Sequence, residues 1–570
     1  MAAPTMATMT ETPPVTTAAT FCATLVDEWM RAGLTYAAVA PGSRSTPMAL
    51  ALAAQDNIAV HVFHDERAGA FAALGHGLAT GKPAVVLCSS GTAGTHFHAA
   101  VVEADLSSVP LLVVTADRPP KLWDVGAPQV IDQTHLYGDV VRAFLEPGVP
   151  DSADASTWRS LAATAWNAAT GSAQWPGPVH LNLSFADPLV GESGALPPGR
   201  DAGAPWHQGL RHHQPASYNE DVASIAGRLV GRTGVIVAGG GTSDPAAVLA
   251  LAQRLGWPVL ADHRSGCRRA DVSISCFDAL LRDPQFAELN RPQVILRFGQ
   301  ILSSKALSQW IAASDADVIV ARTGRVPSDP ERVARTFITE AGLAIALLDR
   351  LPPTMTPAPT LQVWKEADQK ATAAMDAVLA GQGWSEPAMA RAVLKSIGPD
   401  DALMLSSSMP VRDVEWYGGP RTGIRVFSNR GANGIDGVVA TAIGIATTGL
   451  RTTVLIGDVA FLHDSTALIA LAGRNLNLTI VVCDNGGGGI FSFLPQRKQL
   501  ADERFEQLFG TPHGTDLETL ARAHGLTVEH WTEDLPELTP RGVRIIIAPT
   551  DRAANVAHHD ALNAAVANRG

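Results

Sequence analysis

The sequence predicts an α/β protein of three domains, each built on a parallel sheet flanked by helices. Short apolar segments alternate with helical patterns along almost the whole chain, and such alternation is typical of parallel sheets covered by helices. Two Pro-rich stretches interrupt the alternation. The chain has 570 residues, which is more than one hydrophobic core usually serves, so several domains are expected.

The expected strands are apolar runs that end at small or polar residues, as buried strands do. They read AVVLCSS and LLVVTA in the first part, GVIVAGGG, WPVLAD, QVILRFG and ADVIVAR in the middle, and TTVLIGD and LTIVVCDN in the last part. The glycines of GVIVAGGG lack the G-x-G-x-x-G spacing of a dinucleotide loop. We therefore expect a strand-to-helix turn there.

The Pro-rich stretches at residues 186–206 and 348–360 divide the chain. We predict a disordered tail over residues 1–20, a first domain over 21–190, a middle domain over 191–360 and a third domain over 361–570. The tail lacks the basic and apolar regions of a secretory signal. No apolar run approaches the roughly 18 residues of a membrane span. We therefore expect a cytoplasmic protein without a membrane span.

The first and third parts share a layout. Val86 and Leu112 lie 26 residues apart in successive expected strands, and Val454 and Ile480 have the same separation. A helix of small residues precedes each pair. We predict related folds for the first and third domains and a different, Rossmann-like fold for the middle domain.

Composition excludes some classes of function. The 43 basic and 55 acidic residues give a net charge of −12, which argues against nucleic-acid binding, because that needs a basic face. The five cysteines form no C-x-x-C pair, so reduced thiols are expected. Arg268 and Arg269 are adjacent in the middle part; we expect solvated charge there, and a regulatory anion site is the alternative.

Two polar side chains follow neighbouring expected strands of the third part. Asp458 comes directly after one strand and Asn485 after the next, which places both at the carboxyl edge of a parallel sheet, where α/β proteins bind ligands. A carboxylate, an amide oxygen and a carbonyl from the following Gly run suit Mg²⁺, with phosphate and water completing its shell. The plain alternative is a turn Asp and a turn Asn-Gly. A helix is expected to begin near His463 and Asp464.

The segment HDERAG in the first part begins a helix of small residues. Asp65 could be its N-cap and Glu66 could lie in its first turn, since acidic side chains suit a helix amino end. The alternative is that one of these carboxylates takes part in chemistry.

Gly457-Asp458, followed by 26 residues and Asn485, resembles the metal motif of the thiamin diphosphate enzymes, with Val459 and Asp484 as departures from that motif. The resemblance implies thiamin diphosphate held through Mg²⁺, which Mn²⁺ can replace, with the Asp458 and Asn485 side chains and the Gly487 carbonyl as metal ligands. It also implies a catalytic Glu66, hydrogen-bonded to the aminopyrimidine ring and assisting loss of the C2 proton. The cofactor-binding residues it implies are Glu66, Ser428, Asn429, Gly457, Asp458, Asn485, Ile490 and Phe491.

Three further motifs, PGSRST, TADRPP and SNRGANGIDG, closely resemble those of the 2-succinyl-5-enolpyruvyl-6-hydroxy-3-cyclohexene-1-carboxylate synthases, thiamin diphosphate-dependent transferases of menaquinone biosynthesis. Such an enzyme decarboxylates 2-oxoglutarate and adds the resulting succinyl-semialdehyde carbanion to isochorismate in a 1,4-addition. The alternative is another thiamin diphosphate decarboxylase or carboligase, such as an acetolactate synthase. A cofactor-free relative of the fold is a further alternative. The superfamily implies at least a homodimer, and we expect a homotetramer.

Both implied substrates carry two carboxylates, which favours arginine because its guanidinium pairs with a carboxylate in two places. The alternative for each arginine is a surface salt bridge. Two departures concern these contacts: Pro128 stands where some members have Asn, and Ala306 where some have Arg. The resemblance assigns substrate contact to Ser43, Arg44, Arg118, Gln129, Lys305, Ser408, Arg412 and Arg430.

Overall fold

The computed structural model describes residues 13–171, 175–207, 218–269, 271–353, 358–532, 536–538 and 542–567. The chain forms two compact units. The first comprises residues 1–77, 81–101 and 109–211, and the second comprises residues 78–80, 102–108 and 212–570. Three six-stranded sheets run through these units, and the neighbouring strands of each are parallel. The predicted α/β class with three parallel sheets is confirmed.

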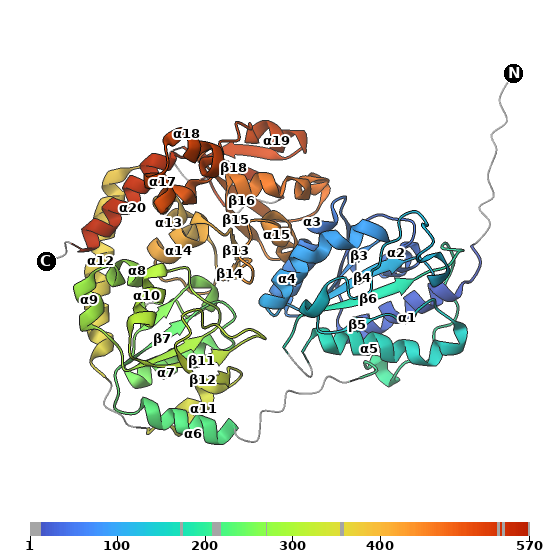
Figure 1. Cartoon of the computed structure of the whole chain (residues 1–570), viewed down its shortest axis with the longest axis horizontal. Helices are drawn as coiled ribbons and strands as arrows, with labels where there is room; N and C mark the ends of the chain where they lie inside the picture. The colour runs from blue at the N-terminus through green and yellow to red at the C-terminus, as the bar shows by residue number, and fades with distance from the viewer. Residues whose placement is uncertain are drawn as a thin grey trace. The chain divides into compact units, whose positions relative to one another are not determined.

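The first sheet has the strand order β2-β1-β3-β4-β6-β5. Helices α1, α2 and α5 cover one face, packing on the sheet around Trp29, Leu112 and Leu181, and α3 and α4 lie on the other face (Figure 1). The strands are Tyr36–Val39 (β1), Ala59–Val62 (β2), Ala84–Cys88 (β3), Leu111–Asp117 (β4), Phe144–Leu145 (β5) and Pro178–Ser184 (β6), and the helices are Thr17–Ala32 (α1), Thr46–Ala53 (α2), Glu66–Thr80 (α3), His98–Leu106 (α4) and Trp158–Ala169 (α5).

Helix α1 begins inside the segment that we expected to be a tail. The Thr16 side chain accepts a hydrogen bond from the Ala19 amide at 3.2 Å, which caps the helix. Val15 forms a bridge with Glu192. The expected tail over residues 1–20 is therefore wrong for residues 13–20, and residues 1–12 lie outside the described part of the chain.

The third sheet has the order β14-β13-β15-β16-β18-β17. Numbered from the first strand of each domain, this is the order of the first sheet, 2-1-3-4-6-5, which confirms that the two folds are related. The strands are Ala402–Leu405 (β13), Arg425–Phe427 (β14), Thr452–Gly457 (β15), Leu478–Asp484 (β16), Thr527–His530 (β17) and Val543–Pro549 (β18), and the helices are Glu386–Ser396 (α13), Met409–Tyr417 (α14), Val438–Ala446 (α15), Asp458–His463 (α16), Pro495–Gln499 (α17), Asp502–Phe505 (α18), Leu517–Ala523 (α19) and Arg552–Ala567 (α20).

The middle sheet has the order β12-β11-β10-β7-β8-β9, which is the doubly wound Rossmann order when its strands are renumbered. Along β7, Ile236 and Ala238 face one core, which α6, α7 and α11 cover, and Val235 and Val237 face the other. The strands are Gly234–Ala238 (β7), Val259–Ala261 (β8), Ser273–Ile274 (β9), Val294–Phe298 (β10), Asp317–Arg322 (β11) and Ala334–Thr339 (β12), and the helices are Tyr218–Leu229 (α6), Pro245–Leu255 (α7), Phe277–Leu281 (α8), Pro284–Leu289 (α9), Lys305–Ala313 (α10), Leu343–Arg350 (α11) and Thr360–Gln382 (α12).

The glycine turn after β7 leads into α7, as expected. Asp244 caps that helix by accepting the Ala247 amide at 2.9 Å. A Cβ on Gly239 would lie 1.8 Å from the Gln300 carbonyl oxygen. The backbone at Gln300, after β10, therefore lies directly against this turn and requires a glycine at position 239.

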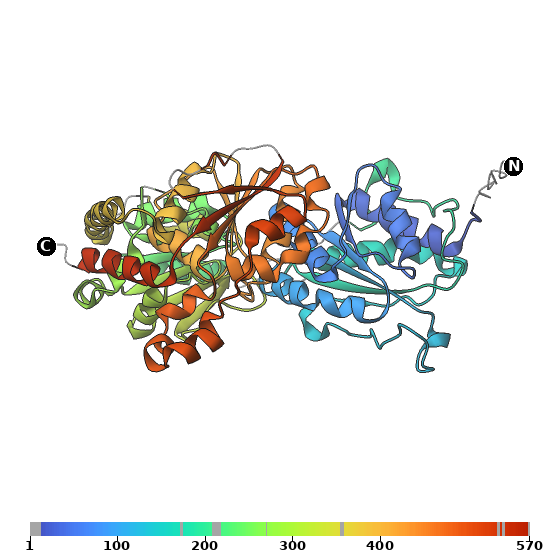
Figure 2. The ribbon, with the colours of Figure 1, turned by 90° about the horizontal axis from the view of Figure 1, so that it is seen from above.

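The long helix α12 packs on the middle sheet through Trp364, Ala371 and Met375, together with Leu562 and Val566 of α20. Figure 2 shows these two helices at the same end of their unit.

The domain boundaries at residues 190 and 360 stay predictions. Among the described helices, none is both long and apolar enough to cross a membrane. All five cysteines are buried and unpaired, as expected.

Arg268 corrects a prediction, because its side chain is not solvated. It is 1% exposed and donates hydrogen bonds to the carbonyl oxygens of Ala261, Ser275 and Gly418 at 2.9, 2.7 and 2.7 Å. The sequence could not reveal this, because one acceptor, Gly418, lies 150 residues away and the other two are backbone groups that carry no sequence signal. Arg269 is exposed.

We expect Arg268→Met to lower the free energy of unfolding by about 3 kcal/mol, because three buried carbonyl groups lose their donor. Urea denaturation followed by circular dichroism measures the change. Arg269→Met is the matched control and should stay within about 0.5 kcal/mol of the parent protein, as exposed substitutions usually do. Equal effects of the two substitutions would contradict the structural role of Arg268.

Candidate active site

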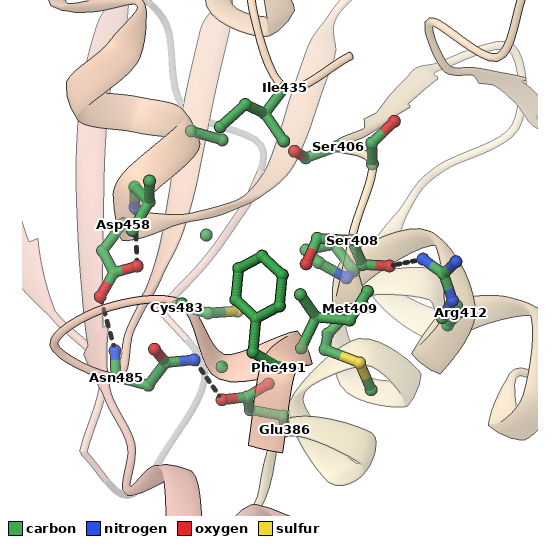
Figure 3. Close-up of a pocket in the computed structure, with 18 of the residues that line it drawn as sticks. Glu386, Ser406, Ser408, Met409, Arg412, Ile435, Asp458, Cys483, Asn485 and Phe491 are labelled. Carbon is green, nitrogen blue, oxygen red and sulfur yellow. Dashed lines mark hydrogen bonds between the residues drawn. The ribbon is translucent and has the colours of Figure 1, made fainter. Parts of the chain in front are cut away.

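A cavity of about 480 Å³ opens at the carboxyl edge of the third sheet. Strands β15 and β16 are neighbours in register, with Gly457 opposite Cys483, so the residues that follow them share this edge, as predicted. Figure 3 shows the cavity with side chains from several elements pointing into it. The lining residues include Glu386, Ser406, Ser407, Ser408, Met409, Arg412, Arg430, Asn433, Gly457, Asp458, Asn485, Gly487, Gly488, Gly489, Ile490 and Phe491.

Asp458 is one of the buried acidic groups of this cavity, with 2% exposure. Its Oδ1 accepts the Val459 amide at 2.6 Å, and its Oδ2 accepts the amides of Asn485 at 3.1 Å and Gly487 at 2.9 Å. Burial raises its pKa, and the hydrogen bonds from the Val459 and Gly487 amides oppose the rise. The carboxylate therefore holds the turn after β16 directly against the start of α16.

Helix α16 begins at Asp458, so the expectation of a helix starting near His463 and Asp464 is wrong. The extended Gly457 precedes the helix, with φ −81° and ψ 158°, and Asp458 lies in the first turn. An acidic side chain there is stabilised by the unpaired amides and the helix dipole. The helix ends at His463, where we expected it to begin.

Asn485 offers an amide oxygen to the cavity. Its Nδ2 donates to Glu386 Oε1 at 3.0 Å, and its Oδ1 is buried without a hydrogen-bond partner among the described residues. Such an orphaned oxygen beside a carboxylate fits a hard cation. The Gly487 carbonyl accepts the Gly489 amide at 2.9 Å, which leaves its second lone pair for a further contact.

Close packing explains the glycine run after Asn485. Gly487 has φ +154°, and a Cβ there would lie 2.1 Å from the Gly510 carbonyl oxygen. A Cβ on Gly489 would lie 2.6 Å from Asn485 Nδ2. The loop therefore reaches its position only because these residues have no side chain.

Glu386, at the start of α13, is a site residue that the sequence did not indicate. It is 3% exposed and also accepts a hydrogen bond from the Thr550 hydroxyl at 2.9 Å. Burial, and then the nearby charge of Asp413, raise its pKa to about 7. No motif surrounds Glu386 in the sequence, and its burial becomes visible only in the fold.

His513 is a second residue that the sequence did not indicate. Possible ligand atoms of Asp458, Asp484 and His513 lie within 4.8 Å of one another. His513 Nδ1 accepts the Thr515 amide at 3.0 Å, so the neutral ring carries its proton on Nε2. This nitrogen lies 3.4 Å from Asp458 Oδ2. In this arrangement the ring acts as a donor toward Asp458, not as a metal ligand.

Arginines supply positive charge to the same cavity. Arg412 Nη1 donates to the Ser408 carbonyl at 2.6 Å, and Ser408 itself has φ +76° just before α14, a strained conformation for a residue with a side chain. Burial, followed by the charges of Arg264 and Arg412, lowers the pKa of Arg430 to about 10. Among the described residues no carboxylate forms an ion pair with Arg412 or Arg430. This region of the cavity therefore suits an anion.

Ile490 and Phe491 also line the cavity, and Figure 3 shows Phe491 between Asp458 and Arg412. Ser428 and Asn429 do not line it. Ser428 Oγ donates to the Leu405 carbonyl at 2.6 Å, and Asn429 Nδ2 donates to Thr441 Oγ1 at 3.1 Å, so both are buried supports of neighbouring backbone.

Lys305 lies outside this cavity. It is the exposed first residue of α10 and lines a groove of about 650 Å³ with Ala306, Arg282, Arg291 and other residues of the middle domain. The structure therefore gives no support to Lys305 as a substrate contact. Its neighbour Ala306 packs against the middle core.

The remaining predicted residues belong to the first unit, at the carboxyl edge of its sheet. Asp65 caps α3 by accepting the Arg67 amide at 2.9 Å, and Glu66 is the first residue of that helix. The loops that follow or approach this edge carry Ser43, Arg44, Arg118 and Gln129. Arg44 donates a hydrogen bond to the Phe185 carbonyl at 2.9 Å, and Gln129 donates one to the Ser90 carbonyl at 3.1 Å. Burial, with a smaller effect from the Arg118 charge, lowers the pKa of Arg44.

Comparison with known families agrees with this arrangement. The description "Thiamine pyrophosphate enzyme, N-terminal TPP binding domain" matches residues 19–136, "Middle domain of thiamine pyrophosphate" matches 202–405, and "Thiamine pyrophosphate enzyme, C-terminal TPP binding domain" matches 415–546. The two related sheets, the Rossmann-like middle domain and the Asp458–Asn485 pair thus define a thiamin diphosphate-dependent enzyme.

Three relatives carry the name 2-succinyl-5-enolpyruvyl-6-hydroxy-3-cyclohexene-1-carboxylate synthase. The protein of Thermobifida fusca is 41% identical, with 95% of this chain and 98% of the relative covered. The protein of Myxococcus xanthus is 37% identical, with 95% of this chain and 96% of the relative covered. The protein of Listeria monocytogenes is 35% identical, with 96% of this chain and 97% of the relative covered. The chain belongs to this synthase family. The matches favour it over the acetolactate synthase alternative.

Proposed function

We propose that this protein decarboxylates 2-oxoglutarate with thiamin diphosphate and adds the resulting four-carbon unit to isochorismate, a step of menaquinone biosynthesis. The observation that carries the proposal is one cavity with two kinds of wall. Asp458 and Asn485 offer oxygen ligands on one side, and Arg412 lies on the other. Arg430 also lines the cavity, and neither arginine has an ion-pair partner among the described residues. Substrates with several carboxylates suit the second wall.

We also propose that Mg²⁺, or Mn²⁺ in its place, links this wall to the cofactor diphosphate. The buried Oδ1 of Asn485, which lacks a partner among the described residues, and the adjacent Asp458 carboxylate support a hard cation here. The Gly487 carbonyl is the proposed third protein ligand. Gly457, Ile490 and Phe491 are proposed to contact the cofactor, and Ser428 and Asn429 to act from behind the cavity wall.

When bound, thiamin diphosphate supplies the carbon nucleophile and the electron sink for decarboxylation. Glu66 is proposed to hold a proton at the aminopyrimidine ring nitrogen. Arg44, Arg118, Arg412 and Arg430 hold substrate carboxylates, with Ser43, Gln129 and Ser408 as hydrogen-bonding partners. Fixing both substrates in attack geometry removes a large part of the entropic barrier.

The proposal includes an assembly of at least two copies, with a homotetramer as the expected form, and a location in the cytoplasm. The support for the assembly is the superfamily resemblance, and the five unpaired cysteines agree with a reducing compartment. Light scattering on the purified full-length protein measures the assembly. A monomer at enzymatic concentrations would contradict it.

The decisive experiment follows isochorismate consumption with 2-oxoglutarate, Mg²⁺ and thiamin diphosphate, omitting each component in turn. The proposal expects turnover only with the complete mixture, and little turnover when pyruvate replaces 2-oxoglutarate. Pyruvate used as well as 2-oxoglutarate, or turnover without isochorismate loss, would overturn it.

We expect Arg430→Met to raise the KM of an anionic substrate by about 10- to 100-fold, because a charge-assisted hydrogen bond contributes about 1.5–3 kcal/mol. Steady-state kinetics with each substrate varied separately identifies which one Arg430 holds. Arg451→Met is the matched control, since Arg451 pairs with Asp401 away from the cavity. An unchanged KM for both substrates in Arg430→Met would remove Arg430 from the proposed site.

A further inference from the structure

Asn485 can present only one end of its amide to the cavity, and a neighbouring side chain decides which end. If Oδ1 faces the cavity, the side chain offers a metal ligand. If the NH₂ group faces the cavity, it would repel a cation. The terminal amide torsion is soft, so it does not select an orientation by itself. In the structure Nδ2 points to Glu386 Oε1 and Oδ1 is buried without a partner among the described residues.

We infer that Glu386 is a positioning residue that orients the Asn485 amide for metal binding, an inference that rests on the proposed metal site. Glu386 Oε1 accepts the Nδ2 hydrogen at 3.0 Å, which holds the NH₂ end of the amide on Glu386 and leaves Oδ1 as the end offered to the cavity. Figure 3 shows Asp458, Asn485 and Glu386 following one another along one wall. Partners that fix metal ligands in this way commonly change metal affinity when they are removed.

Two further contacts hold this arrangement in place. The Thr550 hydroxyl donates to the same Glu386 oxygen at 2.9 Å, so the carboxylate is held from the side of β18 as well. Gly489 leaves space for the amide, because a Cβ there would lie 2.6 Å from Asn485 Nδ2. Glu386 is 3% exposed, so water does not compete freely for its oxygen atoms.

The test measures Mn²⁺ affinity of the full-length protein at saturating thiamin diphosphate, from the electron paramagnetic resonance signal of free Mn²⁺. Because outer-shell partners typically contribute about 10- to 100-fold to metal affinity, Glu386→Ala is expected near the upper end and Glu386→Gln near the lower end. Glutamine keeps an acceptor oxygen and nearly the same shape. Thr550→Val should give a smaller loss than either.

Asp401→Asn is the matched control, a buried carboxylate immediately before β13 that pairs with Arg451. It should lower thermal stability and leave Mn²⁺ affinity unchanged. Parent-like affinity in both Glu386→Gln and Glu386→Ala would overturn this inference and leave the metal proposal standing. Absence of Mn²⁺ binding by the parent protein would overturn the metal proposal and, with it, the inference.

Discussion

Glu66→Gln is expected to lower turnover by about 10²- to 10⁴-fold, the usual contribution of a positioned acid–base group, while thiamin diphosphate still binds. Glutamine has the shape of glutamate but cannot hold and release the proton at the aminopyrimidine ring. Because Glu66 is the first residue of α3, the substitution leaves the helix cap at Asp65 intact. Steady-state turnover and calorimetric titration of the cofactor provide the two measurements.

Asp65→Asn is the control for this prediction. Asparagine caps helices about as well as aspartate, so the helix start and the position of Glu66 should be kept while one neighbouring charge is removed. We expect turnover close to that of the parent enzyme. Full activity in Glu66→Gln would remove Glu66 from the mechanism, and equal losses in the two variants would indicate a structural effect of the helix start.

Those parts of the site that follow buried strands were predictable from the sequence. Asp458 and Asn485 end two apolar runs, and parallel pairing of β15 with β16 brings such ends to one edge of the sheet. The repeated spacing of strands likewise predicted that the first and third sheets are related. These features depend on local pattern and on a connection rule, both of which can be read along the chain.

Glu386, His513 and Arg268 were not predictable in this way, because their roles depend on partners far away in sequence. Glu386 meets Asn485 and Thr550 from different elements, and Arg268 reaches the carbonyl of Gly418. A charged residue in a sequence normally indicates a solvated surface. Only the fold reveals when hydrogen bonds allow such a residue to be buried.

Asp458→Asn is expected to weaken Mg²⁺-dependent binding of thiamin diphosphate by more than the roughly 10- to 100-fold typical of outer-shell changes. Mg²⁺ sites commonly use one or two carboxylates, and this substitution removes the carboxylate on the proposed metal. The NH₂ group that replaces one of the two oxygens must face either the Val459 amide or the amides of Asn485 and Gly487. The substitution therefore removes at least one backbone hydrogen bond of the site together with the charge.

Asp484→Asn is the control that distinguishes metal binding by Asp458 from the general effect of removing one negative charge nearby. Asp484 has a possible ligand atom within 4.8 Å of one on Asp458, but it is not among the proposed ligands. We expect calorimetric titration of thiamin diphosphate at fixed Mg²⁺ to give a nearly unchanged affinity for Asp484→Asn and a severe loss for Asp458→Asn. Equal losses would make Asp484 a ligand as well. An unchanged affinity in Asp458→Asn would contradict the proposed metal site. Among the described residues of the cavity wall, Asp458 is the carboxylate that accepts a hydrogen bond directly from the glycine loop, so no other residue could replace it.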